Sequence, residues 1–145
     1  MRSRTIDVFS AAVTFDHLAY LVRDTAQSVE ALRPFFQEVR LLRKRHELQA
    51  AYITYLSTGD GGITIELVEP FEQNRLLADR LNREKQRCLP YHICFRVDDF
   101  EAEYKRMREH GWLTLTRPFA GLSSATQAAH LYKPAAGIVE IVGRR

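Results

Sequence analysis

The chain has 145 residues, with 21 Lys and Arg against 18 Asp and Glu, which gives a net charge of +3. This length predicts a single domain over residues 1–145, and 46% apolar with 27% charged residues excludes disordered, collagen-like and low-complexity classes. The sequence shows neither an apolar span for a membrane nor a basic, aromatic-interleaved block for nucleic acid. Two cysteines exclude a disulfide framework, so we expect a cytoplasmic protein.

The first half of the chain predicts a strand, a helix and three further strands. Alternation along residues 15–22 sets Leu18, Tyr20 and Val22 on one face and His17 on the other. A helix should follow, capped at Asp24 or Thr25 and bent or ended by Pro34. Strands are predicted over residues 40–49, 51–57 and 64–68. A short connecting helix is predicted within residues 73–86.

The second half repeats this order. The strand that carries His92 matches the first strand at an offset of 75 residues, and the strand that carries Glu140 matches the one with Glu66 at an offset of 74. Between them lie a helix, capped at Asp98 or Asp99 and closed by Gly111, and strands over residues 112–117 and 128–132. The sequence therefore predicts an α+β chain of two βαβββ modules, about 13–70 and 89–143, joined by a helical linker.

Each half places one histidine and one glutamate on the face opposite its large apolar side chains. The four residues are His17, Glu66, His92 and Glu140. Inward charges are costly unless they are paired or bound to a cation, and two nearby carboxylates repel each other. Mixed nitrogen and oxygen donors suit Zn, Ni, Co, Mn or Fe and leave positions open for substrate. The pattern therefore favours a divalent metal site, although each residue alone would more often be structural.

The other histidines have no evident counterpart in the opposite half. They are His46, His110 and His130. We interpret them as surface residues or as local hydrogen-bonding residues.

The arrangement of these residues resembles the vicinal oxygen chelate superfamily, which includes glyoxalase I, bleomycin-resistance proteins, extradiol dioxygenases and methylmalonyl-CoA epimerase. The stretches FDHLAYLV at 15–22, ITIELVEP at 63–70 and YHICFRVDDFEAEYKRMREHG at 91–111 look most like the epimerases. The resemblance implies a curved mixed sheet around a metal-binding cavity, with the four residues above as ligands. Where the epimerases carry a substrate-facing glutamate in the third strand, this chain has Tyr52, which either donates a proton or simply packs.

The chemistry that this resemblance implies is carbon-acid chemistry. A metal with two free positions can bind a carbonyl and stabilise the enolate that forms when a neighbouring proton leaves. We therefore expect a metal-dependent isomerase or epimerase, with Glu140 as the first candidate base and Glu66 as the second.

Three alternatives remain from the sequence. One is a glyoxalase-like lyase. Another is an extradiol-type oxygenase, against which the second carboxylate at Glu66 counts, because those enzymes use two histidines and one carboxylate. The third is a non-enzymatic protein that binds a small molecule and confers resistance.

The expected partner is a small-molecule substrate, which includes a coenzyme A thioester among its candidates. Four arginines follow Glu66 and could contact a phosphate-bearing carrier, although a solvated helix face is favoured: Arg75, Arg80, Arg83 and Arg87. Unpaired sheet edges favour a homodimer.

Overall fold

The structure is a computed structural model that describes residues 13–123 and 125–144. Within these residues the chain forms, in order, β1 (Val13–Val22), α1 (Thr25–Leu32), a 3-10 turn (Arg33–Phe35), β2 (Glu38–His46), β3 (Ala51–Ser57), β4 (Thr64–Pro70), α2 (Arg75–Glu84), β5 (Cys88–Val97), α3 (Phe100–Glu109), β6 (Leu113–Thr114), β7 (Phe119–Ala120), β8 (Thr126–Lys133) and β9 (Gly137–Arg144). The strands form one sheet in the order β2-β3-β4-β1-β5-β9-β8-β6, and β7 pairs with β8.

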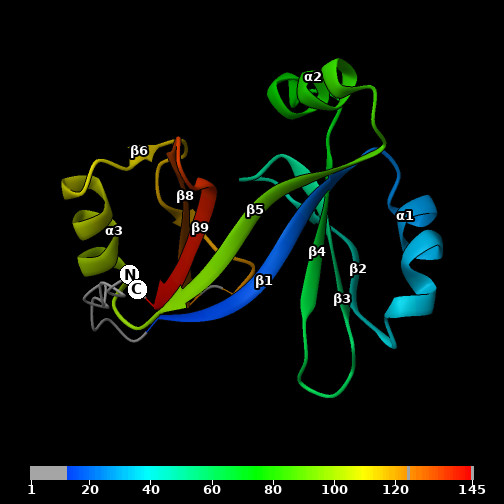
Figure 1. Cartoon of the computed structure of the whole chain (residues 1–145), viewed down its shortest axis with the longest axis horizontal. Coiled ribbons are helices and arrows are strands. Elements are labelled where there is room, and N and C mark those ends of the chain that lie inside the picture. Colours follow the sequence, from blue (N-terminus) through cyan, green and yellow to red (C-terminus); the bar gives the residue numbers. More distant parts are fainter. Residues whose placement is uncertain (1–12, 124, 145) are drawn as a thin grey trace, which may run out of the picture.

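The sheet is mixed and curved, and its two halves meet at the central pair β1 and β5 (Figure 1). These two strands run antiparallel, whereas β4 lies parallel to β1 and β9 lies parallel to β5. The two halves therefore have the same topology around the central pair. The expected α+β fold class, with two βαβββ modules in a curved mixed sheet, is confirmed.

The helices begin and end where the sequence predicts. The Asp24 side chain caps α1 by accepting from the amide of Gln27 at 3.0 Å, and Asp99 caps α3 by accepting from the amide of Ala102 at 3.0 Å. Pro34 converts the end of α1 into the 3-10 turn, and Gly111 follows α3 at a positive φ of 83°. The connecting helix is α2.

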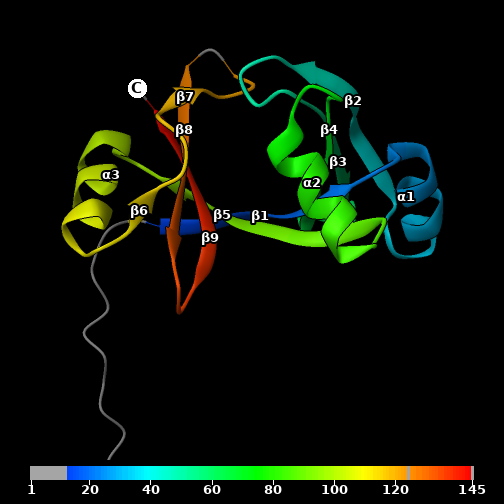
Figure 2. The ribbon, with the colours of Figure 1, turned by 90° about the horizontal axis from the view of Figure 1, so that it is seen from above.

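Helices α1 and α3 lie at the two outer flanks of the molecule (Figure 2). Val29 and Leu32 of α1 pack against the face of the first half that contains Leu18 and Tyr20. In the second half, Phe100 and Met107 of α3 pack on the corresponding face, whose buried residues are Val97, Ala129, Leu131, Val139 and Ile141. Because successive strand residues face opposite sides, this packing turns His17 and its neighbours on alternate positions toward the concave side.

The strand expected over residues 112–117 is shorter than predicted. It is reduced to the two residues of β6, and a further two-residue strand, β7, follows at Phe119. The amides of Leu115 and Thr116 both donate to the His130 carbonyl, at 2.9 and 3.3 Å, so the regular ladder stops there. Pro118 has no amide with which to resume it. Among the described residues, no helix has the length and apolar character needed to cross a membrane.

Candidate metal centre

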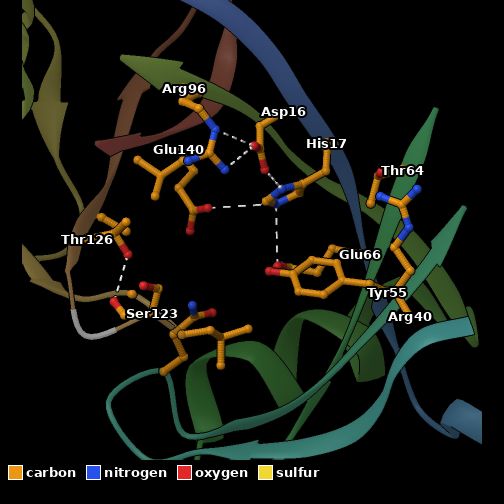
Figure 3. A pocket seen from close by; sticks show the side chains of 15 residues that line it. Asp16, His17, Arg40, Tyr55, Thr64, Glu66, Arg96, Ser123, Thr126 and Glu140 are labelled. Atoms are coloured by element: carbon orange, nitrogen blue, oxygen red, sulfur yellow. Dashed lines mark hydrogen bonds and ion pairs between the residues drawn. The ribbon is translucent and has the colours of Figure 1, made fainter. Parts of the chain in front are cut away.

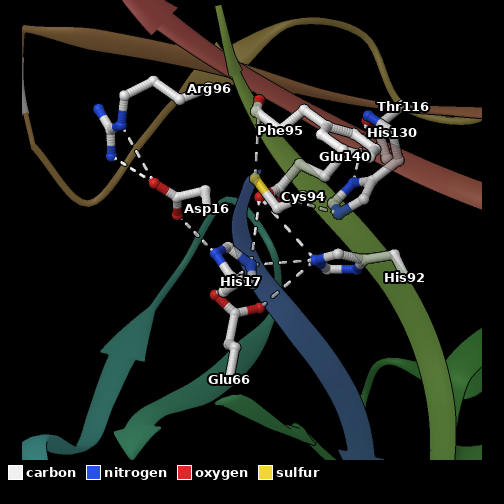
Figure 4. A network of polar contacts seen from close by, with 10 residues as sticks. All are labelled: Asp16, His17, Glu66, His92, Cys94, Phe95, Arg96, Thr116, His130 and Glu140. Carbon is white, nitrogen blue, oxygen red and sulfur yellow. Dashed lines mark hydrogen bonds and ion pairs between the residues drawn. The ribbon is translucent and has the colours of Figure 1, made fainter. Parts of the chain in front are cut away.

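The four side chains that the sequence selects point toward one another (Figure 4). His17 comes from β1 and Glu66 from β4, whereas His92 comes from β5 and Glu140 from β9. The sheet register explains the convergence, because Ala19 lies beside both Glu66 and His92, and Cys94 lies beside both His17 and Glu140. All four residues are buried, with exposed fractions between 1% and 4%.

The donor atoms lie at distances typical of groups around one cation. His17 Nε2 is 3.3 Å from His92 Nε2, 3.4 Å from Glu66 Oε2 and 3.7 Å from Glu140 Oε1. His92 Nε2 is 3.7 Å from Glu66 Oε1 and 3.9 Å from Glu140 Oε1. Two donors that each lie about 2.1 Å from a shared ion are about 3.0 Å apart at a right angle and about 3.4 Å apart in a tetrahedron. Among the described residues, two overlapping groups of donor atoms have the size of a metal coordination shell: His17, Glu66 and His92, and His92, His130 and Glu140.

One buried polar atom that faces the cluster has no partner. Glu66 Oε1 is shielded from solvent and has no hydrogen-bond partner among the described residues. A buried carboxylate oxygen without a partner is costly, and a bound cation would satisfy it. The residues present are thus suited to a divalent metal ion.

The two carboxylates are electrostatically different. Burial raises the pKa of Glu66 and the nearby charge of Glu140 raises it further, against the opposing effects of His17 and Tyr55, so the pKa lies well above its ordinary value. Burial also disfavours ionised Glu140, but His130, His92 and His17 outweigh that effect and hold its pKa below the ordinary range. Two ionised carboxylates at one buried site repel each other, and Glu66 is the one that favours its protonated form.

The two histidines of the cluster also differ. Burial alone would lower the pKa of His17, but its hydrogen bond to Asp16 and the charges of Glu66 and Glu140 raise it above the ordinary value. Burial lowers the pKa of His92 to about 3, with Glu140 only partly opposing it. His92 is therefore a neutral imidazole at physiological pH, the form that binds metals.

Each glutamate faces a polar side chain from the neighbouring strand. Tyr55 on β3 lies opposite Glu66, and His130 on β8 lies opposite Glu140. The Tyr55 hydroxyl hydrogen-bonds Glu66, and His130 Nε2 lies 2.9 Å from Glu140 Oε2. The numbers 55 and 130 differ by 75, the offset of the internal repeat, so this signal was present in the sequence.

Of the two interpretations of His130, the surface residue was wrong and the local hydrogen-bonding residue agrees with the contact between its Nδ1 and Thr116 Oγ1 at 3.3 Å. The expectation that it has no counterpart was also wrong. His130 is 3% exposed, and its counterpart in the first half is Tyr55. His110 is exposed and its Nδ1 bonds the Arg106 carbonyl at 2.8 Å, whereas His46 is buried and accepts from the amide of Gln49 at 3.3 Å.

Tyr52 does not join the cluster. It pairs with Glu69 on β4, and its side chain lies on the opposite face of the sheet from that of Tyr55. The Tyr52 ring lies against the Phe71 ring with a centroid distance of 4.9 Å. The Arg43 guanidinium lies 3.9 Å from the centre of the same ring. Of the two alternatives for Tyr52, this placement agrees with a residue that packs rather than with a proton donor at the cluster.

Asp16 and Arg96 extend the cluster toward solvent (Figures 3 and 4). His17 Nδ1 lies 2.7 Å from Asp16 Oδ2, and Asp16 Oδ1 accepts from Arg96 Nε at 3.1 Å and from Nη2 at 2.7 Å. Neither residue was predicted from the sequence to make this contact.

A cavity of about 430 Å³ opens in front of the cluster (Figure 3). His17, Glu66 and Glu140 line its floor, together with Tyr55. Its other lining residues are largely polar and include Arg40, Gln49, Thr64, Arg96, Ser123 and Thr126. A small polar molecule therefore has access to the candidate ligands.

The four arginines for which a solvated helix face was favoured over contact with a phosphate carrier do not line this cavity. Arg80 on α2 donates to the Pro90 carbonyl at 3.1 Å, and Arg87 donates to the Gln27 side chain at 3.2 Å. Arg75 and Arg83 are exposed.

Residues 16–129 match the family model described as the glyoxalase/bleomycin resistance protein/dioxygenase superfamily. None of the curated proteins matches the chain in sequence. Similar solved structures include methylmalonyl-CoA epimerase from Mycobacterium tuberculosis, with a TM-score of 0.76, 19% identity, and coverage of 95% of this chain and 93% of that one.

A second similar structure is a variant of Streptomyces coelicolor methylmalonyl-CoA epimerase in complex with 2-nitronate-propionyl-CoA, with a TM-score of 0.71, 26% identity, and coverage of 90% of this chain and 96% of that one. A hypothetical protein from Bacillus halodurans C-125 has a TM-score of 0.70 and 22% identity, and covers 92% of this chain and 96% of its own.

Proposed function

The chain belongs to the glyoxalase/bleomycin resistance protein/dioxygenase superfamily, and on this basis we propose that it is a metal-dependent isomerase or epimerase. The proposed reaction stabilises the enolate of a small carbonyl or acyl-thioester substrate. The observation that carries the proposal is the convergence of His17, Glu66, His92 and Glu140, two residues from each half, beside an open cavity.

These four residues would hold the metal. Both imidazoles present Nε2 to the cluster, and the two carboxylates supply oxygen donors and negative charge. A divalent cation in such a site supplies Lewis-acid polarisation of a carbonyl oxygen. The donor set suits Zn, Ni, Co, Mn or Fe.

A glutamate carboxylate would take the proton. The C–H bond beside the substrate carbonyl breaks, its electron pair moves into the enolate, and the proton forms an O–H bond on the carboxylate. Glu66 fits this role better than Glu140, which the sequence placed first. Its Oε1 has no hydrogen-bond partner among the described residues. His130 instead holds Glu140 as an anion.

Epimerisation also needs a group that returns the proton from the opposite face of the enolate. Glu140 comes from the other half of the chain and lines the same cavity as Glu66. Because Glu140 is held as an anion, it would first take up a proton, for which His130 Nε2, 2.9 Å from its Oε2, is the adjacent group. On that condition the two halves would supply the two proton-transfer groups of an epimerase.

A coenzyme A thioester is the proposed substrate class, because structural neighbours are named as methylmalonyl-CoA epimerases and one is in complex with 2-nitronate-propionyl-CoA. The support comes from these neighbours rather than from the arginines of α2. The polar cavity would take the acyl end of the substrate.

Deuterium incorporation tests the proposal. Methylmalonyl-CoA is incubated in D₂O with protein stripped of metal by a chelator and resupplied with one divalent ion at a time. We expect α-carbon exchange only with added metal, and a loss of about 100-fold or more in Glu66→Gln and Glu140→Gln. Glu103→Gln, at a buried glutamate of α3 outside the cavity, is the control.

Other outcomes would contradict the proposal and favour an alternative. Undiminished exchange in both variants would exclude the proposed bases. Oxygen consumption with added Fe(II) would favour an oxygenase, and conversion of an added hemithioacetal would favour a lyase. Metal-free protein that binds its ligand with undiminished affinity would favour a binding or resistance protein.

We also propose that two chains associate through the convex side of β1 and β5. Val13, Phe15 and Ile93 are exposed there at 42%, 47% and 39%. Burial of exposed apolar side chains is the main driving force of association. Light scattering should give the mass of a dimer, and a monomer at micromolar concentration would contradict this part of the proposal.

A further inference from the structure

We propose that Asp16 is a positioning residue that fixes the ring of His17 for metal binding, and that Arg96 in turn holds Asp16. This inference rests on the proposed function, since it assumes that the cluster binds a cation.

A β-bulge brings Asp16 to the side of the sheet where His17 lies. Phe15 pairs with Phe95 and His17 pairs with Cys94, so Asp16 is an extra residue that has no Cα partner in the pairing of β1 with β5. In a regular strand the side chains of residues 16 and 17 would point to opposite faces. The bulge re-aims the carboxylate of Asp16 so that it reaches the next residue, at 2.7 Å.

The contact selects one form of the His17 ring. An ionised carboxylate can only accept, so the 2.7 Å contact requires a proton on Nδ1. A neutral imidazole carries one N–H, which leaves Nε2 with a free lone pair. Nε2 is the atom that faces His92, Glu66 and Glu140. Asp16 therefore presents to the cluster the nitrogen that can bind a cation.

Arg96 fixes the carboxylate itself. Two of its N–H groups donate to Asp16 Oδ1, at 3.1 and 2.7 Å, and leave Oδ2 directed at His17. The Arg96 side chain is 54% exposed, against 24% for Asp16. Solvent weakens an exposed ion pair, so the effect of Arg96 should be smaller than that of Asp16.

The second half has no such arrangement. The residue before His92 is Tyr91, whose ring lies edge-on against the His92 ring at a centroid distance of 4.6 Å. His92 Nδ1 has no hydrogen-bond partner among the described residues. The two imidazoles are thus held differently, His17 by a charged hydrogen bond and His92 by aromatic neighbours.

Nitrogen NMR of the metal-free protein tests the orientation directly. Imidazole ¹H–¹⁵N correlation spectra, recorded as the pH is raised until the rings are neutral, distinguish the two tautomers. We expect His17 to carry its proton on Nδ1 in the wild type, and to shift toward the other tautomer or a mixture in Asp16→Asn. A neutral His17 with its proton on Nε2 in the wild type would overturn the proposal.

Zinc affinity of the full chain, measured by competition with a chromogenic chelator, gives the second readout. We expect Asp16→Asn to weaken Zn²⁺ binding by about 10- to 100-fold and Arg96→Gln by only a few-fold. The control is Glu69→Gln, which removes a partly buried carboxylate bonded to Arg43 and Thr25 away from the cluster. It should leave the affinity unchanged.

The outcomes separate this proposal from the proposed function. Zn²⁺ binding by Asp16→Asn as tight as in the wild type overturns the positioning role alone. Absence of binding of Zn²⁺ and of the other candidate ions, Ni²⁺, Co²⁺, Mn²⁺ and Fe²⁺, in the wild type contradicts the metal-dependent function, whatever the His17 tautomer. If Asp16→Asn fails to fold in a thermal melt, the tautomer of the wild-type protein still decides whether Asp16 orients the ring.

Discussion

Replacing Glu66 by glutamine should stabilise the metal-free protein and at the same time weaken metal binding. Glu66 is 1% exposed, and its raised pKa means that the surroundings favour the neutral form. Glutamine is neutral, nearly isosteric, and keeps a carbonyl oxygen for the Tyr55 hydroxyl. The substitution therefore removes a buried charge that the metal-free site compensates incompletely, but it also removes an anionic ligand.

The size of the effect follows from burial. Full burial can raise a carboxyl pKa by about 3 to 5 units, each worth about 1.4 kcal/mol, and the contacts with His17 and Tyr55 offset part of this. We expect a net gain of about 1–3 kcal/mol at pH 8. For 145 residues the unfolding entropy is about 0.3 kcal/mol per degree, so Tm should rise by about 3–10 °C. The gain should shrink toward pH 6, where wild-type Glu66 can hold its proton.

Thermal melts with and without Zn²⁺ provide the assay. At a free concentration of about 100 times Kd, the ion should stabilise the wild type by about 2.7 kcal/mol, or about 9 °C, and Glu66→Gln by much less. The control is Glu103→Gln, because Glu103 is also buried but forms an ion pair with Arg106. This variant should lower Tm and respond normally to zinc. A fall in Tm for metal-free Glu66→Gln would refute the reasoning. It would mean that the ion pairs within the cluster stabilise the metal-free protein with ionised Glu66 in place.

Three further predictions concern pH, the neighbour of Glu66 and helix capping. The raised pKa of His17 means that protons compete with the metal for its ring. Zn²⁺ affinity should therefore increase as the pH rises above the ordinary histidine value of about 6.5, and level off once the ring is neutral. A Zn²⁺ affinity that does not change from pH 6 to 8 would contradict this. Tyr55→Phe should lower Zn²⁺ affinity by about tenfold, whereas Tyr52→Phe, on the other face of β3, should leave it unchanged; equal effects would show that the strand register is not decisive. Asp99→Ala should remove the cap of α3 and lower Tm by about 3 °C without altering zinc binding, and an unchanged Tm would show that the cap contributes little.

The four candidate ligands could be found from the sequence because strand geometry is strictly periodic. Once His17 was set opposite Leu18 and Tyr20, the repeat offset carried the same assignment to His92. The same offset also relates Tyr55 to His130, but it was not applied to residues of different type. Family resemblance instead points to Tyr52, which lies three residues before Tyr55 and therefore on the opposite face of β3.

The Asp16 contact could not be predicted in this way. Simple alternation puts residues 16 and 17 on opposite faces, and only the bulge in the β1–β5 pairing brings them together. A bulge depends on the register of two strands that are far apart in sequence, which the pattern of either strand alone does not contain. The short β6 has a similar origin, because it depends on two amides that converge on His130.

The boundary between the two halves, at the central strand pair β1 and β5, also divides the candidate ligands equally. Residues before α2 supply one imidazole and one carboxylate, and residues after it supply the other two. A chain severed within α2 would yield two fragments, each with half of the donors and neither able to surround an ion alone. Added metal would then favour reassembly of the fragments. The cation would hold the two halves of the chain together as well as act as a Lewis acid in the cavity.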